Sequence, residues 1–157
     1  MAGLYRIADE PIPGRLAGLT VNPFFPLLAV MVGGFWLAVP WFALNGAAMG
    51  SATRRREWLW LAGGLLVTGA LGGALLHGLV TDAVPARAVR YAVVALVALR
   101  LVVAYAVFTL QQASFELHRH FGGLVRNGVL VLVAAALVRP ERLIGRSGAF
   151  LLEVLVG

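Results

Sequence analysis

The chain contains no cysteine and no lysine, and only seven of its 157 residues are acidic. The lack of cysteine excludes disulfides, iron–sulfur clusters and thiol chemistry. All 13 basic residues are therefore arginine, which most simply reflects GC-rich coding. Because nearly all of these arginines stand outside the apolar segments or at their ends, they favour contact with lipid headgroups over nucleic-acid binding.

Catalytic and nucleotide-binding motifs are also missing. The sequence has no G-x-S-x-G elbow, no H-E-x-x-H zinc motif and no P-loop. Its serines have no evident base and acid partners, and no acidic residue falls inside an apolar segment. We therefore expect no enzymatic activity, no cofactor and no carboxylate relay for protons or sodium ions.

The sequence consists mainly of long apolar segments, since 61% of its residues are hydrophobic and 13% are charged. Crossing a bilayer takes about 20 predominantly apolar residues in a helix. Four segments approach or reach that length, and we predict membrane-spanning helices over residues 23–45, 57–80, 90–111 and 123–138. The fourth would be roughly 24 Å long, slightly short of a hydrocarbon core of about 30 Å.

These segments predict an all-α fold, an integral membrane four-helix bundle over residues 23–138. A polar arm over residues 1–22 precedes it, where Pro11 and Pro13 oppose a continuous helix. Residues 139–157 place apolar and polar side chains on opposite sides at helical spacing, which predicts a short amphipathic helix in the membrane interface. A water-soluble helical domain is the alternative, and segments that are apolar all round argue against it.

Four crossings would place both termini on the same side of the membrane. We expect a multi-pass protein of a cell membrane, in a bacterial inner membrane, with cytoplasmic termini. The arginine counts are nearly equal, with seven on the side of the termini and five on the other. The orientation is chosen because moving the charged N-terminal segment across the membrane would need special help. The residues expected to anchor the chain at the interface are Arg54, Arg55, Arg56, Trp58, Trp60, Arg142 and Arg146.

Arg100 stands in the middle of the apolar segment 90–111. A charge at that depth costs at least about 2.5–3.5 kcal/mol on insertion scales, and no acidic residue lies at a matching depth. We expect Arg100 to face the bundle and to contact an anion, a lipid headgroup or an acidic residue of another subunit. A snorkelling arginine in a thinned bilayer is the alternative.

A polar segment with Glu116, His118 and His120 follows, and it is expected to extend the third helix as far as Gly122–Gly123. Glu116 and His120 share a helix face, whereas His118 points elsewhere. Two ligands do not make a zinc site, so we expect no metal, and the role of this polar edge stays open. Because His77 falls about 30 Å away along the helices, it cannot share a haem iron with His118 or His120.

Glycines at Gly69 and Gly73, with His77 one turn further, form a small-xxx-small pattern on one helix face. This spacing predicts the close approach of a neighbouring helix, from the same chain or from another one.

Together these features predict a non-catalytic multi-pass membrane protein. It would act as a structural, scaffolding or regulatory subunit of a membrane complex, in contact with membrane lipids and with other subunits or copies of itself. One alternative is a small oligomeric channel or transporter in which Arg100 lines an anion-attracting path. Another is an enzyme that acts on lipids at the Glu116–His120 edge.

Overall fold

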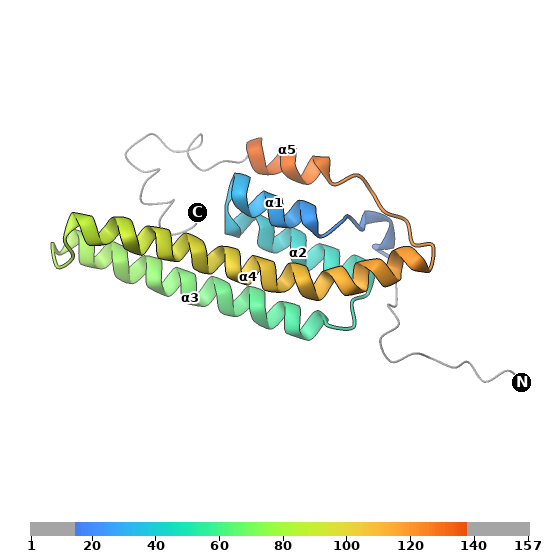
Figure 1. Cartoon of the computed structure of the whole chain (residues 1–157), viewed down its shortest axis with the longest axis horizontal. Coiled ribbons are helices and arrows are strands. Elements are labelled where there is room, and N and C mark those ends of the chain that lie inside the picture. The colour runs from blue at the N-terminus through green and yellow to red at the C-terminus, as the bar shows by residue number, and fades with distance from the viewer. Residues whose placement is uncertain (1–14, 138–157) are drawn as a thin grey trace, which may run out of the picture.

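The computed structural model describes residues 15–137, and over this range the chain is helical apart from its turns (Figure 1). Two long helices, α3 (Arg54–Val80) and α4 (Ala86–His120), form an antiparallel hairpin along the molecule. Three shorter helices, α1 (Phe24–Gly33), α2 (Phe35–Met49) and α5 (Val129–Leu137), lie beside one half of that hairpin. A 3-10 turn, η1 (Ala17–Leu19), precedes α1. The all-helical architecture predicted from the sequence is confirmed.

Segment 23–45, predicted as one spanning helix, instead forms two helices that double back on each other. The reversal is at Gly34, whose φ of +89° suits glycine and strains other residues. From there α2 returns to the end of the molecule from which α1 started (Figure 1). With 10 and 15 residues, the two helices are only about 15 Å and 22 Å long. The prediction of a continuous helix here is wrong.

The two long helices contain the predicted spans 57–80 and 90–111, and both are long and apolar enough to cross a membrane. α4 continues to His120 and is followed by Gly122, which has a φ of +75°. This extension of the helix and its end next to the glycine pair match the sequence-based prediction. Two of the described helices, rather than four, therefore have the length of a membrane span.

The fourth predicted span, 123–138, is described as a loop followed by the nine-residue helix α5. The loop pairs with the segment before α1, because the Arg126 N–H donates to the Thr20 carbonyl at 2.7 Å. α5 packs against α1, and a Cβ at Gly33 would lie 3.0 Å from the Cβ of Ala135. Apolar residues from all five α-helices form the core: Ala29, Val30, Phe35, Ala38, Phe42, Leu61, Val103, Ala104, Val107, Val131 and Ala135.

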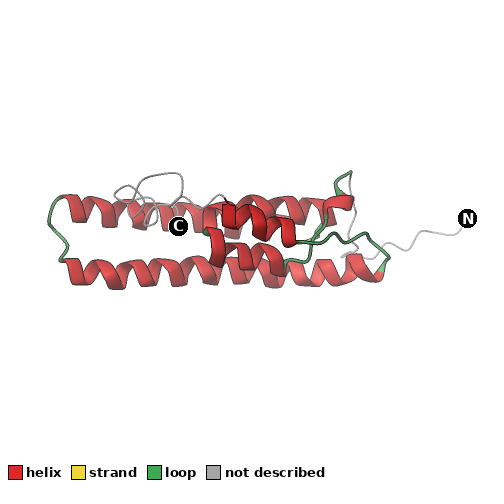
Figure 2. Cartoon of the chain, turned by 90° about the horizontal axis from the view of Figure 1, so that it is seen from above, coloured by secondary structure: helices red, strands yellow, loops and turns green. Residues whose placement is uncertain are grey.

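The half of the α3–α4 hairpin that leads to its turn extends beyond the three short helices, as Figure 2 shows from above. Large apolar side chains are exposed along this half, among them Leu66, Leu71, Val80, Val94 and Val97. Such a surface is unusual for a helix pair surrounded by water. Most of the predicted polar arm and the predicted amphipathic helix 139–157, with Arg142 and Arg146, lie outside the described residues.

Candidate functional site

A cluster of polar side chains lies where α2 ends, α3 begins and the last third of α4 passes. We call this cluster the polar network, and all of its members except Thr53 are buried. They come from three helices and from the turn between α2 and α3: Asn45, Ser51, Thr53, Glu57, Gln111 and Ser114. Because it draws on all three helices, the network is positioned to fix them relative to one another.

The carboxylate of Glu57 is the centre of the network and is only 2% exposed. Its Oε1 accepts hydrogen bonds from the Ser51 hydroxyl and, at 2.8 Å, from the Thr53 hydroxyl. Its Oε2 accepts from the Gln111 amide at 2.8 Å. Within residues 15–137 every side-chain donor to this carboxylate is neutral. A buried carboxylate needs such bonds to offset its loss of water, and the amino end of α3 adds a favourable dipole.

Gln111 links the carboxylate to the α1–α2 hairpin. Its amide nitrogen also donates to the Phe42 carbonyl at 2.7 Å, and its amide oxygen accepts from Asn45 at 3.4 Å. The Asn45 oxygen in turn accepts from the Val21 N–H at 2.9 Å. A second link runs from Ser51 to Ser114, whose hydroxyl oxygens are 3.0 Å apart. Hydrogen bonds therefore run without a break from the segment before α1 to both long helices.

The burial of Glu57 differs from what its neighbours in sequence suggest. The sequence places Glu57 directly after three arginines, in a segment that reads as a solvated turn. All three arginines, Arg54, Arg55 and Arg56, are exposed, while Glu57 faces inward. Thr53 precedes Glu57 by four residues, one more than the spacing of a capping box, so the sequence carries no specific signal for this burial.

Arg100 lies inside the bundle and is 3% exposed. Arg100 has an interaction partner in the structure. This burial removes Arg100 from the outer surface of the chain, which is where a pore between several copies would form. The structure therefore gives no specific support to the channel alternative.

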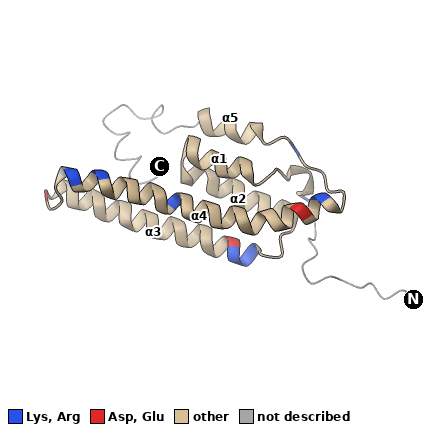
Figure 3. Cartoon of the chain, viewed as in Figure 1, with Lys and Arg blue, Asp and Glu red and all other residues tan. Residues whose placement is uncertain are grey.

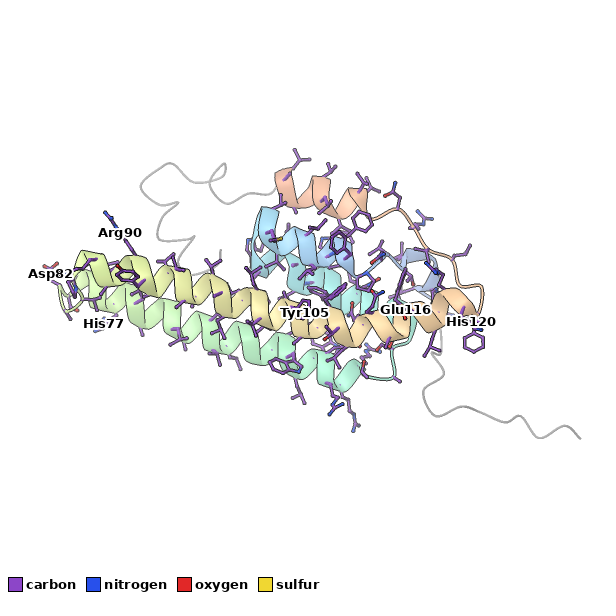
Figure 4. All side chains as sticks on the ribbon, viewed as in Figure 1. His77, Asp82, Arg90, Tyr105, Glu116 and His120 are labelled. Atoms are coloured by element: carbon purple, nitrogen blue, oxygen red, sulfur yellow. The ribbon has the colours of Figure 1, made fainter. Side chains whose placement is uncertain are left out.

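The three polar residues near the end of α4 are divided between two environments. Glu116 and His120 are exposed (Figure 4); Glu116 accepts a hydrogen bond from Gln112 at 2.9 Å. His118 is buried beside Gly123, with its Nε2 3.4 Å from the Leu124 carbonyl oxygen. Among the residues described, no group of three or more His, Asp or Glu side chains is placed to hold a metal ion. His77 lies at the other end of the molecule.

The small-residue face of α3 is open in the described part of the chain. A Cβ at Gly69 or Gly73 would meet nothing within 4 Å, and His77 is exposed. The close approach of α3 to its neighbours is made by Gly64 instead. A Cβ there would lie 2.6 Å from Val103 of α4 and 3.1 Å from the Phe35 ring.

Two adjacent glutamines of α4 offer a matched test of the polar network. Gln111→Leu removes one hydrogen-bond partner from each of three buried groups: the Glu57 carboxylate, the Phe42 carbonyl and the Asn45 amide. We expect a loss of about 2–5 kcal/mol in the free energy of unfolding. Gln112→Leu removes only an exposed bond to Glu116, so its effect should stay within about 0.5 kcal/mol. Denaturant titration in one detergent measures both, and equal effects would contradict this role of the network.

The polar network joins α2, α3 and α4 through hydrogen bonds between their side chains. The network has a carboxylate and hydroxyl groups, but these are buried and bonded to one another. The exposed Glu116–His120 edge has a carboxylate and an imidazole on one helix face.

No family model matches the chain, and no curated protein or solved structure does so either.

Proposed function

We propose that the chain is a non-catalytic, multi-pass membrane protein that serves as a structural subunit of a membrane complex. The observation that carries the proposal is the bare apolar surface of the α3–α4 hairpin beyond the short helices. Apolar surface of this extent is stable in lipid or against another protein, and not in water. The polar groups of the network, by contrast, form hydrogen bonds with other groups of the same chain.

Charged residues support this placement in a bilayer. They gather at the two ends of the long hairpin, with Arg100 between them (Figure 3). From Tyr91 to Leu110, α4 rises about 30 Å, which matches a hydrocarbon core. In this placement α1 and α2 enter and leave by the same face as a re-entrant hairpin, packed against α4 and α5.

The orientation follows from the arginines of the two ends. The end that carries the polar network has six exposed arginines among the described residues, and the other end has two, Arg87 and Arg90. We call the first end the basic end, and its arginines are Arg15, Arg54, Arg55, Arg56, Arg119 and Arg126. Excess arginine favours the cytoplasmic side, so the basic end faces the cytoplasm. This asymmetry is larger than four crossings would give, because the re-entrant hairpin brings the N-terminal segment and the turn before α3 to one face.

Extraction in a mild detergent at native abundance, followed by mass spectrometry of the intact assembly, tests the subunit role. We expect other membrane proteins to remain bound. The double variant Gly69→Leu/Gly73→Leu adds side chains at two positions of α3 where a Cβ meets nothing within 4 Å, and it should reduce that association while the melting temperature is kept.

The matched control is Gly63→Leu, which adds the same side chain at another open position of α3. It should leave the association unchanged. A chain that purifies alone from its native membrane would contradict the subunit role.

A further inference from the structure

We infer that the basic end binds anionic phospholipid headgroups. This inference rests on the membrane placement proposed above. The partner is defined by its chemistry, a phosphate carried at the surface of a bilayer.

The fold gathers this surface from three separate parts of the sequence. The Arg126 N–H bonds the Thr20 carbonyl, which joins the segment after Arg15 to the loop before α5. The bond between Ser51 and Ser114 holds the turn before Arg54–Arg56 against the last turns of α4, which end near Arg119. Figure 3 shows basic residues at the start of α3 and near the end of α4, on the same end of the molecule.

The arginines of the basic end are available to a ligand. All six are exposed, and within the described part of the chain none of them forms an ion pair. The two carboxylates at this end that lie within residues 15–137 have other partners, since Glu57 is buried in the polar network and Glu116 accepts from Gln112. Guanidinium groups bind phosphate through two parallel hydrogen bonds, so this surface suits the phosphates of anionic lipids.

The tryptophans of α3 favour a lipid phosphate over a free one. Trp58 and Trp60 are exposed and follow Arg56 within about one helical turn. Exposed indole rings beside arginines are typical of the headgroup level of a bilayer. A soluble anion would gain nothing from these rings, whereas a lipid can contact the arginines with its headgroup and the rings with its glycerol and upper acyl chain.

Flotation with vesicles, followed by native mass spectrometry of the lipids kept after detergent extraction, tests the inference. The vesicles contain phosphatidylcholine alone or mixed with phosphatidylglycerol. We expect preferential retention of phosphatidylglycerol. The triple variant Arg54→Gln/Arg55→Gln/Arg56→Gln should lower that preference at least about fivefold, and high salt should lower it too. The control Arg87→Gln/Arg90→Gln, at the other end, should keep it.

Three outcomes would overturn the inference. They are equal retention of the two lipids by the unaltered chain, an equal loss in both arginine variants, and displacement of phosphatidylglycerol by inorganic phosphate at matched ionic strength. A different result would contradict the proposal that the chain lies in a membrane: the chain would then fail to float with vesicles of either composition.

Discussion

A single cysteine at Leu16 is expected to react with an impermeant thiol reagent from the same side of the membrane as one at Ala52. A cysteine at Asp82 should react only from the opposite side. All three positions are exposed, and the chain has no cysteine of its own, so each variant carries one reactive thiol. The reason is the reversal at Gly34, which returns α2 to the face where α1 begins.

This labelling separates two arrangements of the same helices. If residues 23–45 crossed the membrane once, Leu16 would be on the side of Asp82 and opposite Ala52. With a re-entrant hairpin, Leu16 and Ala52 label together. In the proposed orientation, with the basic end toward the cytoplasm, they do so only after cells are permeabilised. The effect is nearly all or none. Val102→Cys, whose side chain is exposed on the apolar middle of α4, should stay unlabelled and serves as the control for lipid burial.

The sequence predicts the long hairpin well because length and apolar composition alone define a helix that can span lipid. It does not predict the α1–α2 hairpin, since 22 apolar residues in a row fit either one helix or two short ones. Tertiary contacts decide between them: the close approach of Gly33 to Ala135 and the bond from Asn45 to the segment before α1. Neither contact is visible in the periodicity of the segment.

The same reasoning explains which site residues the sequence reveals. Glu57 stands next to three exposed arginines, so its neighbours in sequence suggest solvent, while its burial depends on Gln111, 54 positions away. The glycines of α3 are a related case. Gly64, Gly69 and Gly73 are equally plausible packing positions in a helix that is apolar all round, and only the position of α4 selects Gly64.

The substitution Gly46→Ala is expected to destabilise the chain by about 2–4 kcal/mol. A Cβ at Gly46 would lie 3.0 Å from the Gln111 amide nitrogen and closer still to the Glu57 carboxylate. Both groups are fixed by the other hydrogen bonds of the polar network. They cannot move away from a new methyl group without breaking the bond that joins α3 to α4.

Gly73→Ala is the matched control, because it makes the same change inside a helix with nothing within 4 Å. It should have the opposite sign, a gain of about 0.5–1 kcal/mol from the higher helix propensity of alanine. Unfolding of both variants in one detergent gives the two values. Combining Gly46→Ala with Gln111→Leu should cost less than the sum of the single changes, since each breaks the same bonds. A harmless Gly46→Ala would mean that Glu57 and Gln111 relax freely. Strict additivity would mean that the two changes do not act on the same bonds.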